Sequence, residues 1–364
     1  MKRSAIVIFI FFSVFLGCTN SGKNNAFDLE EEDILNLEGM KTYFPELLTP
    51  RRLNIVGDYL IVSERSRLSP GLPLIHVIKR DPLEYKFPKG VTGLGPLEIT
   101  DATLIEPGFS DSTFIVYSAM AKKFTDFSLS DSSRLGISEY KQQEGLFGMY
   151  RMFHATDTTV IGIMTNDPNR LVEFSTKDGS RIAGYGNWEE IPDTGHLIDY
   201  TDPDISYHLG EINKGGLKAN RKLGLFVKAN NYRDRIEIFH YDSKTFDIVN
   251  GPRMEVPDFK IKYSGSKSAV IFDRDYPYGY GDVSIGEKYI FALYGGVTDK
   301  QIRETNEIAK IIYVITHYGE VVGRLNLDIS VADMIVDDEL GQIFGITTDE
   351  DPGIVIFDIP EKFL

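Results

Sequence analysis

Two short stretches combine aromatic rings with carboxylates. Residues 273–282 contain three tyrosines and three aspartates, and the only tryptophan is followed directly by two glutamates. Aromatic faces can cover the apolar surface of a sugar ring while carboxylates accept hydrogen bonds from its hydroxyl groups. A pair of acids could also cleave a glycosidic bond. With the polar connection 202–208, the candidate ligand-loop residues are Trp188, Glu189, Asp273, Asp275, Tyr276, Tyr278, Tyr280 and His208.

The alternative is that these loops join neighbouring sheets and that their aromatic rings pack in the core, because such rings bury large areas. Named catalytic signatures such as Gly-x-Ser-x-Gly and His-Glu-x-x-His are missing from the sequence. A dinucleotide fingerprint fails because Gly93 and Gly95 are followed by Pro96 and no helical pattern. The six histidines are scattered. The sequence therefore predicts no catalytic residue, no cofactor and no metal site.

The net charge of −15 restricts the partners. Nucleic acids and anionic lipid surfaces require clustered lysine and arginine, so neither is expected as the main partner. Acidic runs such as Glu30–Asp33 suit solvated turns, and none has the spacing of a calcium-binding loop. Cys18 is the only cysteine, so the chain has no disulfide partner.

The N-terminus has the pattern of an export signal. Lys2 and Arg3 precede a nearly continuous apolar stretch of twelve residues, 5–16, shorter than the roughly 20 residues that a membrane-spanning helix needs. The stretch resembles a bacterial lipoprotein signal, in which Leu16-Gly17 would be followed by lipid-modified Cys18. Ordinary cleavage with an incidental Cys18 is the alternative. We expect a signal peptide over residues 1–17, a flexible tether over 18–33 and a single domain over 34–364.

The remainder of the chain is a series of short apolar runs bounded by Gly, Asp, Asn or Pro, which predicts an all-β fold. The runs form six sets of strand, turn and strand, spaced at roughly 45 to 65 residues. This period favours a six-bladed β-propeller with four-stranded antiparallel blades. Long helical patterns are missing, and residues 298–310 suggest a loop or a short helix. The six sets begin at Tyr59, Phe114, Thr159, Leu223, Tyr289 and Gln342. We interpret Tyr59 as the start of the first clear inner strand.

The sixth set ends too close to the C-terminus to supply its own outer strand. An open blade would leave unpaired backbone groups at its edge. We therefore expect a strand within residues 34–44 to complete the last blade and close the ring.

Three turn motifs resemble those of TolB-like six-bladed propeller lipoproteins. They are Gly93-Leu94-Gly95-Pro96-Leu97-Glu98, the segment 292–296, and the strand and turn of 313–320 with the following Leu-Asn-Leu-Asp. The resemblance implies an exported, lipid-anchored propeller and carries no catalytic residue with it. Residues 19–24 contain no acid. By resemblance to lipoprotein sorting rules, this predicts attachment to the outer membrane facing the periplasm.

Three functions are compatible with these features. The first is a binding or scaffold module of the bacterial cell envelope, with a protein or glycan partner. The second is a hydrolase or lyase acting on carbohydrate or a related small molecule through axial carboxylates. The third is a purely structural envelope protein.

Overall fold

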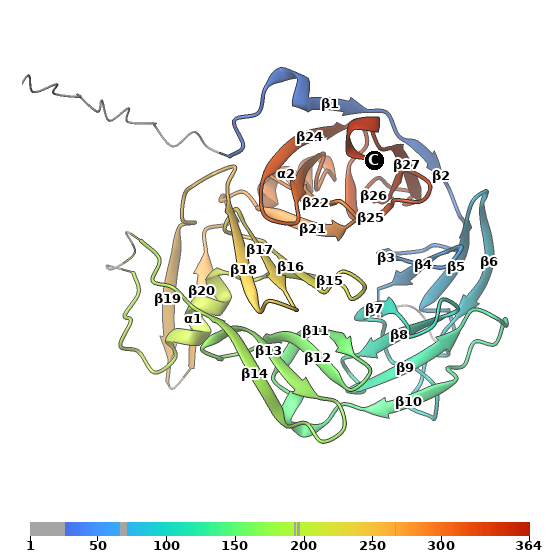
Figure 1. Ribbon diagram of the computed structural model, residues 1–364, viewed down its shortest axis with the longest axis horizontal. Helices are drawn as coiled ribbons and strands as arrows, with labels where there is room; N and C mark the ends of the chain where they lie inside the picture. Colours follow the sequence, from blue (N-terminus) through green and yellow to red (C-terminus); the bar gives the residue numbers. More distant parts are fainter. Residues whose placement is uncertain (1–25, 66–70, 193, 195–196, 266) are drawn as a thin grey trace, which may run out of the picture.

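The computed structural model describes residues 26–65, 71–192, 194, 197–265 and 267–364. Six small sheets stand around a central axis like the blades of a propeller (Figure 1). The predicted all-β, six-bladed architecture is confirmed. The export signal and Cys18 lie outside the described residues. Within the described part, no helix has the length and apolar content needed to span a membrane.

Blades 1 to 4 are antiparallel sheets of four consecutive strands, with the first strand nearest the axis. Blade 1 consists of β3 (Pro50–Val56), β4 (Tyr59–Glu64), β5 (Ile75–Arg80) and β6 (Leu83–Lys89). Blade 2 consists of β7 (Leu104–Pro107), β8 (Thr113–Ser118), β9 (Lys123–Ser128) and β10 (Ser138–Lys141). Blade 3 consists of β11 (Met149–Thr156), β12 (Thr159–Met164), β13 (Asn169–Ser175) and β14 (Arg181–Asn187). Blade 4 consists of β15 (Gly215–Asn220), β16 (Leu225–Asn230), β17 (Arg235–His240) and β18 (Thr245–Asn250).

Blades 5 and 6 take strands from the N-terminus. Blade 5 contains β21 (Tyr280–Ile285), β22 (Tyr289–Tyr294), β23 (Ile311–Thr316) and β24 (Val321–Leu327), and β1 (Ile34–Leu37) pairs in parallel with β24. Blade 6 contains β25 (Val331–Asp337), β26 (Gln342–Thr347) and β27 (Ile354–Asp358), and β2 (Met40–Thr42) pairs antiparallel with β27. Figure 1 shows these N-terminal strands running around the outside of the C-terminal blades. Ring closure by an N-terminal strand is therefore confirmed, and β1 adds a second attachment that the sequence did not predict.

The second and third strands of each blade are the apolar runs seen in the sequence. They are buried on both faces because each sheet is covered by the next blade, as in β16, whose six residues are all buried. The outer strands are largely exposed, for example β14. Interpreting Tyr59 as the start of an inner strand was wrong, because β4 is the second strand of its blade and β3 is the inner one. Inner strands are less apolar because their polar side chains point to the axis.

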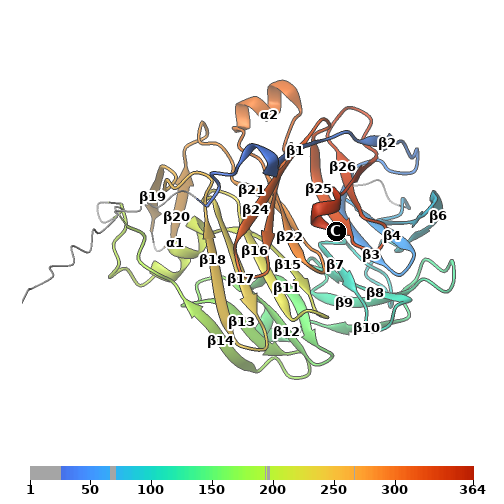
Figure 2. The ribbon, with the colours of Figure 1, turned by 45° about the horizontal axis from the view of Figure 1, so that its top comes forward.

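An insertion beside blade 4 departs from the regular ring. It comprises α1 (Ile205–Ile212) and the hairpin of β19 (Phe259–Ser264) and β20 (Lys267–Phe272). The two segments share a small apolar core that includes Ile198, Leu209 and Phe259. A second helix, α2 (Asp299–Thr305), lies within blade 5 and is raised above the ring in Figure 2. It begins with a capping box in which Thr298 and Gln301 exchange hydrogen bonds.

Residues 26–33, which the sequence places in the tether, contact the ring. The ring of Phe27 lies edge-on to Tyr313 of β23, with 4.7 Å between the ring centroids. Leu29 packs on the same cluster between blades 4 and 5.

We predict that the N-terminal strands are needed for stability. We compare chains that start at residues 26, 34 and 43. The second should melt slightly below the first, because it lacks the contacts of Phe27 and Leu29 with the ring, and the third, which also lacks β1 and β2, should melt at least about 5 °C below the second. Gly39→Ala in the full chain should also lower the melting temperature, because a Cβ atom there would lie 2.5 Å from Val355 and 2.6 Å from Phe357. Equal melting of all three chains would contradict closure by these strands.

Candidate functional site

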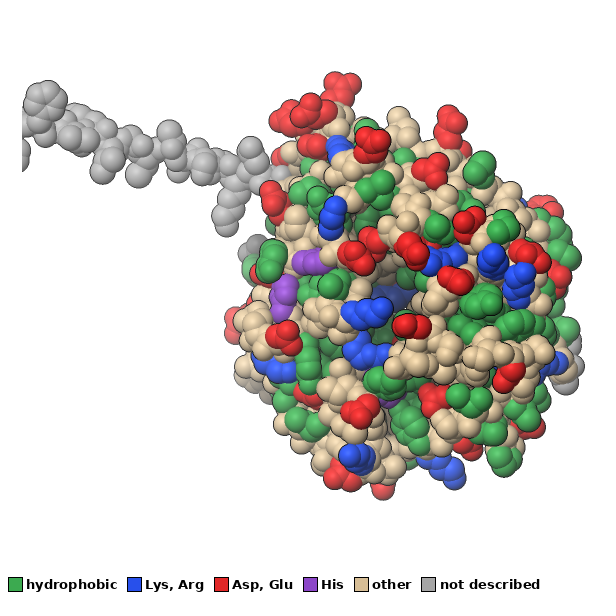
Figure 3. All heavy atoms as spheres, turned by 45° about the vertical axis from the view of Figure 1, so that its right-hand side comes forward, with side chains coloured by type: hydrophobic (Ala, Val, Ile, Leu, Met, Phe, Trp, Pro, Cys, Tyr) green, Lys and Arg blue, Asp and Glu red, His purple; other side chains and the backbone are tan. Residues whose placement is uncertain are grey.

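The axial channel is lined by charged side chains at one level. Each of the six inner strands carries a charged residue at its third or fourth position. In β7 this residue is Glu106, which is bound to His154 of blade 3, and the other five lie together in the channel. Figure 3 shows lysine and arginine side chains gathered around a hollow, with acidic side chains beside them. The cavity in this channel has a volume of about 20 Å³, which is room for about one water molecule. The five residues are Arg52, Arg151, Lys218, Asp282 and Asp333.

The two aspartates connect neighbouring blades. Asp333 accepts hydrogen bonds from Nη1 of Arg52 at 2.6 Å and from the backbone N–H of Leu53 at 2.7 Å, which joins blade 6 to blade 1. Asp282 accepts the N–H of Met334 at 3.2 Å, which joins blade 5 to blade 6. These N–H groups belong to inner strands, which are sheet edges and need acceptors from outside their own sheet.

The surroundings separate the pKa values of the two aspartates. Burial raises the pKa of Asp282 to about 6, and the nearby charge of Asp333 adds to this effect. Asp333 is equally buried, but Lys218 and Arg52 hold its pKa below the usual value. Asp333 is therefore ionised at mildly acidic as well as neutral pH, whereas Asp282 becomes protonated as the pH falls through about 6.

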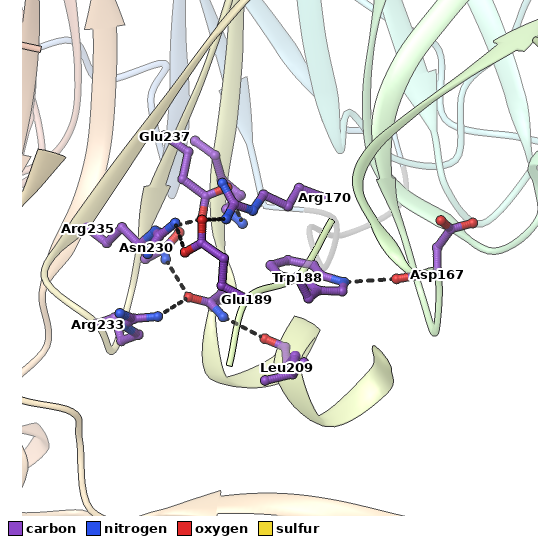
Figure 4. A network of polar contacts seen from close by, with 11 residues as sticks. Asp167, Arg170, Trp188, Glu189, Leu209, Asn230, Arg233, Arg235 and Glu237 are labelled. Atoms are coloured by element: carbon purple, nitrogen blue, oxygen red, sulfur yellow. Dashed lines mark hydrogen bonds and ion pairs between the residues drawn. The ribbon is translucent and has the colours of Figure 1, made fainter. Parts of the chain in front are cut away.

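Trp188 and Glu189 lie at the seam between blades 3 and 4 (Figure 4). The indole N–H of Trp188 donates to the backbone carbonyl of Asp167 at 2.8 Å. Glu189 forms ion pairs with Arg170 at 2.7 Å and with Arg235 at 3.5 Å. Burial alone would raise the pKa of Glu189, but the two arginines lower it. Both residues thus hold the connection between these blades, although the side chain of Glu189 is 64% exposed.

The tyrosine-rich loop 273–282 is divided between surface and core. The backbone N–H of Asp275 donates to the carboxylate of Asp273 at 2.9 Å in an exposed turn. Tyr276 lies beneath the guanidinium of Arg253, and Tyr278 donates to Asp299 at 2.6 Å.

Tyr280 and His208 are both fully buried. The hydroxyl of Tyr280 donates to the carbonyl of Gly251 at 2.7 Å. On α1, Nε2 of His208 lies 2.8 Å from the hydroxyl of Ser268 on β20. Neither side chain offers an exposed face to a ligand.

A groove at one of the candidate loops lies on the insertion. An open groove of about 710 Å³ separates the segment 197–202 from β19. Tyr263 is 59% exposed, and its hydroxyl donates to Asp202 at 2.6 Å. The groove is lined by Leu197, Ile198, Asp199, Tyr200, Asp202, Ile261 and Tyr263.

Sequence reasoning identified the connection that starts at Asp202 but missed Tyr263, because sixty residues separate the two walls of the groove. It also missed the five axial residues. The sequence does contain a signal for these residues, because each inner strand has a charged residue near its start. The inner strands themselves were not identified from the sequence, so this pattern was not seen. The described residues contain no group of three or more His, Cys, Asp or Glu side chains placed to hold a metal ion.

Comparison with known proteins supports the fold. Residues 213–339, from the start of blade 4 into blade 6, match the model of a family described as TolB-like 6-blade propeller-like, so the resemblance seen in the turn motifs is confirmed. No curated protein matches the chain.

Two solved structures from Bacteroides are similar to this chain. A member of the DUF4221 family from Bacteroides vulgatus is 11% identical, with 88% of this chain and 95% of that chain covered and a TM-score of 0.52. A putative exported protein from Bacteroides fragilis is 10% identical, with coverage of 93% and 98% and a TM-score of 0.52. At such low identity the likeness shows a shared fold.

We predict a pH dependence that arises from Asp282. Its pKa is raised in the folded chain above the unfolded value of about 4, so the folded state binds this proton more tightly. The stability that Asp282 contributes is full below pH 4 and is lost as the pH rises through 6, by at most about 3 kcal/mol. Melting curves of the wild type and Asp282→Asn should therefore diverge between pH 4 and 6.5. The exposed Asp275→Asn is the control, and a constant difference between wild type and Asp282→Asn would contradict this assignment.

Proposed function

We propose that this protein is a binding module of the bacterial cell envelope that presents the groove on its insertion to a glycan. The observation that carries the proposal is the contrast between the groove of about 710 Å³ and the axial cavity of about 20 Å³. Pockets that hold small ligands have volumes of about 300–1,000 Å³. The groove reaches this size, whereas the axial cavity is far too small for a sugar.

The lining of the groove suits a sugar. The exposed ring of Tyr263 offers a face for apolar C–H groups, and its hydroxyl is held by Asp202. The hydrogen bond from Tyr263 lowers the pKa of Asp202, and hydrogen bonds from Thr201 lower the pKa of Asp199. Both carboxylates are therefore ionised acceptors for sugar hydroxyl groups at neutral pH.

The contacts of the axial carboxylates favour binding over hydrolysis. Asp333 and Asp282 accept backbone N–H groups of the neighbouring blades, so they serve the ring itself. In the cavity beside them there is no space for a glycosidic bond and its two sugars.

The envelope location rests on the N-terminal pattern, in which a short apolar segment ends at Cys18. We propose that lipid on Cys18 attaches the protein to the outer membrane on its periplasmic side. The fold shared with a putative exported protein is compatible with this location.

We predict that glycan binding requires the groove. The purified wild type should give signals on an array of bacterial glycans, and Tyr263→Ala should reduce affinity at least about tenfold by removing the ring that stacks on the sugar. Asp199→Asn should weaken binding less, because an amide still accepts a hydrogen bond. The control is Tyr318→Ala, which removes an 80% exposed tyrosine in the β23–β24 turn.

Two results would count against the glycan assignment. One is an absence of array signals combined with specific capture of an envelope protein that Tyr263→Ala abolishes, which would assign the groove to a protein partner. The other is glycan binding that Tyr263→Ala leaves unchanged.

We predict that Cys18 is lipid-modified. Mass spectrometry of the mature protein should show an acylated Cys18 as the first residue, and Cys18→Ser should move the protein from the membrane fraction to the soluble fraction. Stable attachment requires more than one acyl chain. An unmodified N-terminus at any other residue would contradict this prediction.

A further inference from the structure

We propose that the axial channel binds one small anionic group between Arg151, Arg52 and Lys218. The site is separate from the groove of the insertion and does not depend on the function proposed for it. Its ligand would be a halide ion or a carboxylate group of similar size.

The charges at this level of the channel do not balance. Three cations, Arg52, Arg151 and Lys218, face the two carboxylates Asp282 and Asp333, because the carboxylate of Glu106 on β7 is bound to His154. Arg52 is paired with Asp333 at 2.6 Å. Nζ of Lys218 lies 3.4 Å from Asp282 and 4.0 Å from Asp333. The carboxylates are therefore used by these two cations and by the backbone of the neighbouring blades, and none is left for Arg151.

Arg151 is the unpaired cation. No hydrogen bond or ion pair joins its guanidinium to another described residue, although it lines the cavity with Arg52 and Lys218. Burial, together with the charges of Arg52 and Arg51, lowers the pKa of Arg151 to about 10. Arg151 is only partly exposed, and an unpaired charge that has lost part of its water is unfavourable, so a small anion at this place would stabilise the folded chain.

The cavity limits the size of the ligand. Its volume of about 20 Å³ accepts one small group next to Arg151. Gly216 of β15 forms part of the wall, and a Cβ atom added there would meet no other atom within 4 Å. A side chain at this position would therefore extend into free space, which offers a way to fill the site without removing a charge.

The test is a thermal titration of the full-length protein in nonionic detergent at constant ionic strength. Chloride or formate replaces a bulky sulfonate buffer anion, and the melting temperature is recorded. For the wild type we expect a saturable rise of about 3 °C or more. A rise with chloride would indicate a free halide, whereas a rise with formate alone would indicate a carboxylate group. No rise with either anion would overturn the proposal.

Two variants assign the effect to the channel. Arg151→Gln should lose the rise and, in the sulfonate buffer, melt at or above the temperature of the wild type, because it removes an unpaired charge. Gly216→Val should lose the rise while Arg151 remains. Arg303→Gln on α2, whose side chain is 68% exposed, is the control and should retain it. A rise that persists in either folded channel variant would overturn the proposal.

Discussion

The ring depends on side chains that satisfy the free backbone edges of its inner strands. Each inner strand has a sheet neighbour on one side only, so part of its N–H groups must find acceptors in the adjacent blade. A lost acceptor would leave a buried N–H group unpaired, at a cost of about 1–3 kcal/mol. Carboxylates do this at three seams, where Glu106 accepts from His154, Asp282 from Met334 and Asp333 from Leu53.

This constraint explains why the axis is charged. Acceptors placed at the seams bring Asp282 and Asp333 together near the axis, and two neighbouring carboxylates raise the pKa of one of them. Arg52 and Lys218 offset that negative charge. An acidic pair in a propeller channel is therefore not in itself a sign of catalysis, because assembly of the ring already requires it. Arg151 is the residue that this requirement does not explain.

The sequence predicted the parts of the fold that hydrophobicity controls. Apolar second and third strands, such as β16 and β17, are visible as continuous runs because blades cover them on both faces. The inner strand β3, with two arginines among its first three residues, has no such run. The candidate loops were found through their aromatic residues, but most of those rings proved to be packing residues. The groove could not be predicted, because contacts between the distant segments 197–202 and 259–264 create it.

The course of the N-terminus determines how the ring would respond to a pulling force. A load applied ahead of residue 26 reaches the contact of Phe27 with Tyr313 first, then β1, and only afterwards β2. A load directed along β1 would act together on the hydrogen bonds that join this strand to β24. Blade 5 thus shields the closure of blade 6 from tension. A pull on the N-terminal segment therefore loads β1 before it reaches β2, the strand that closes the ring.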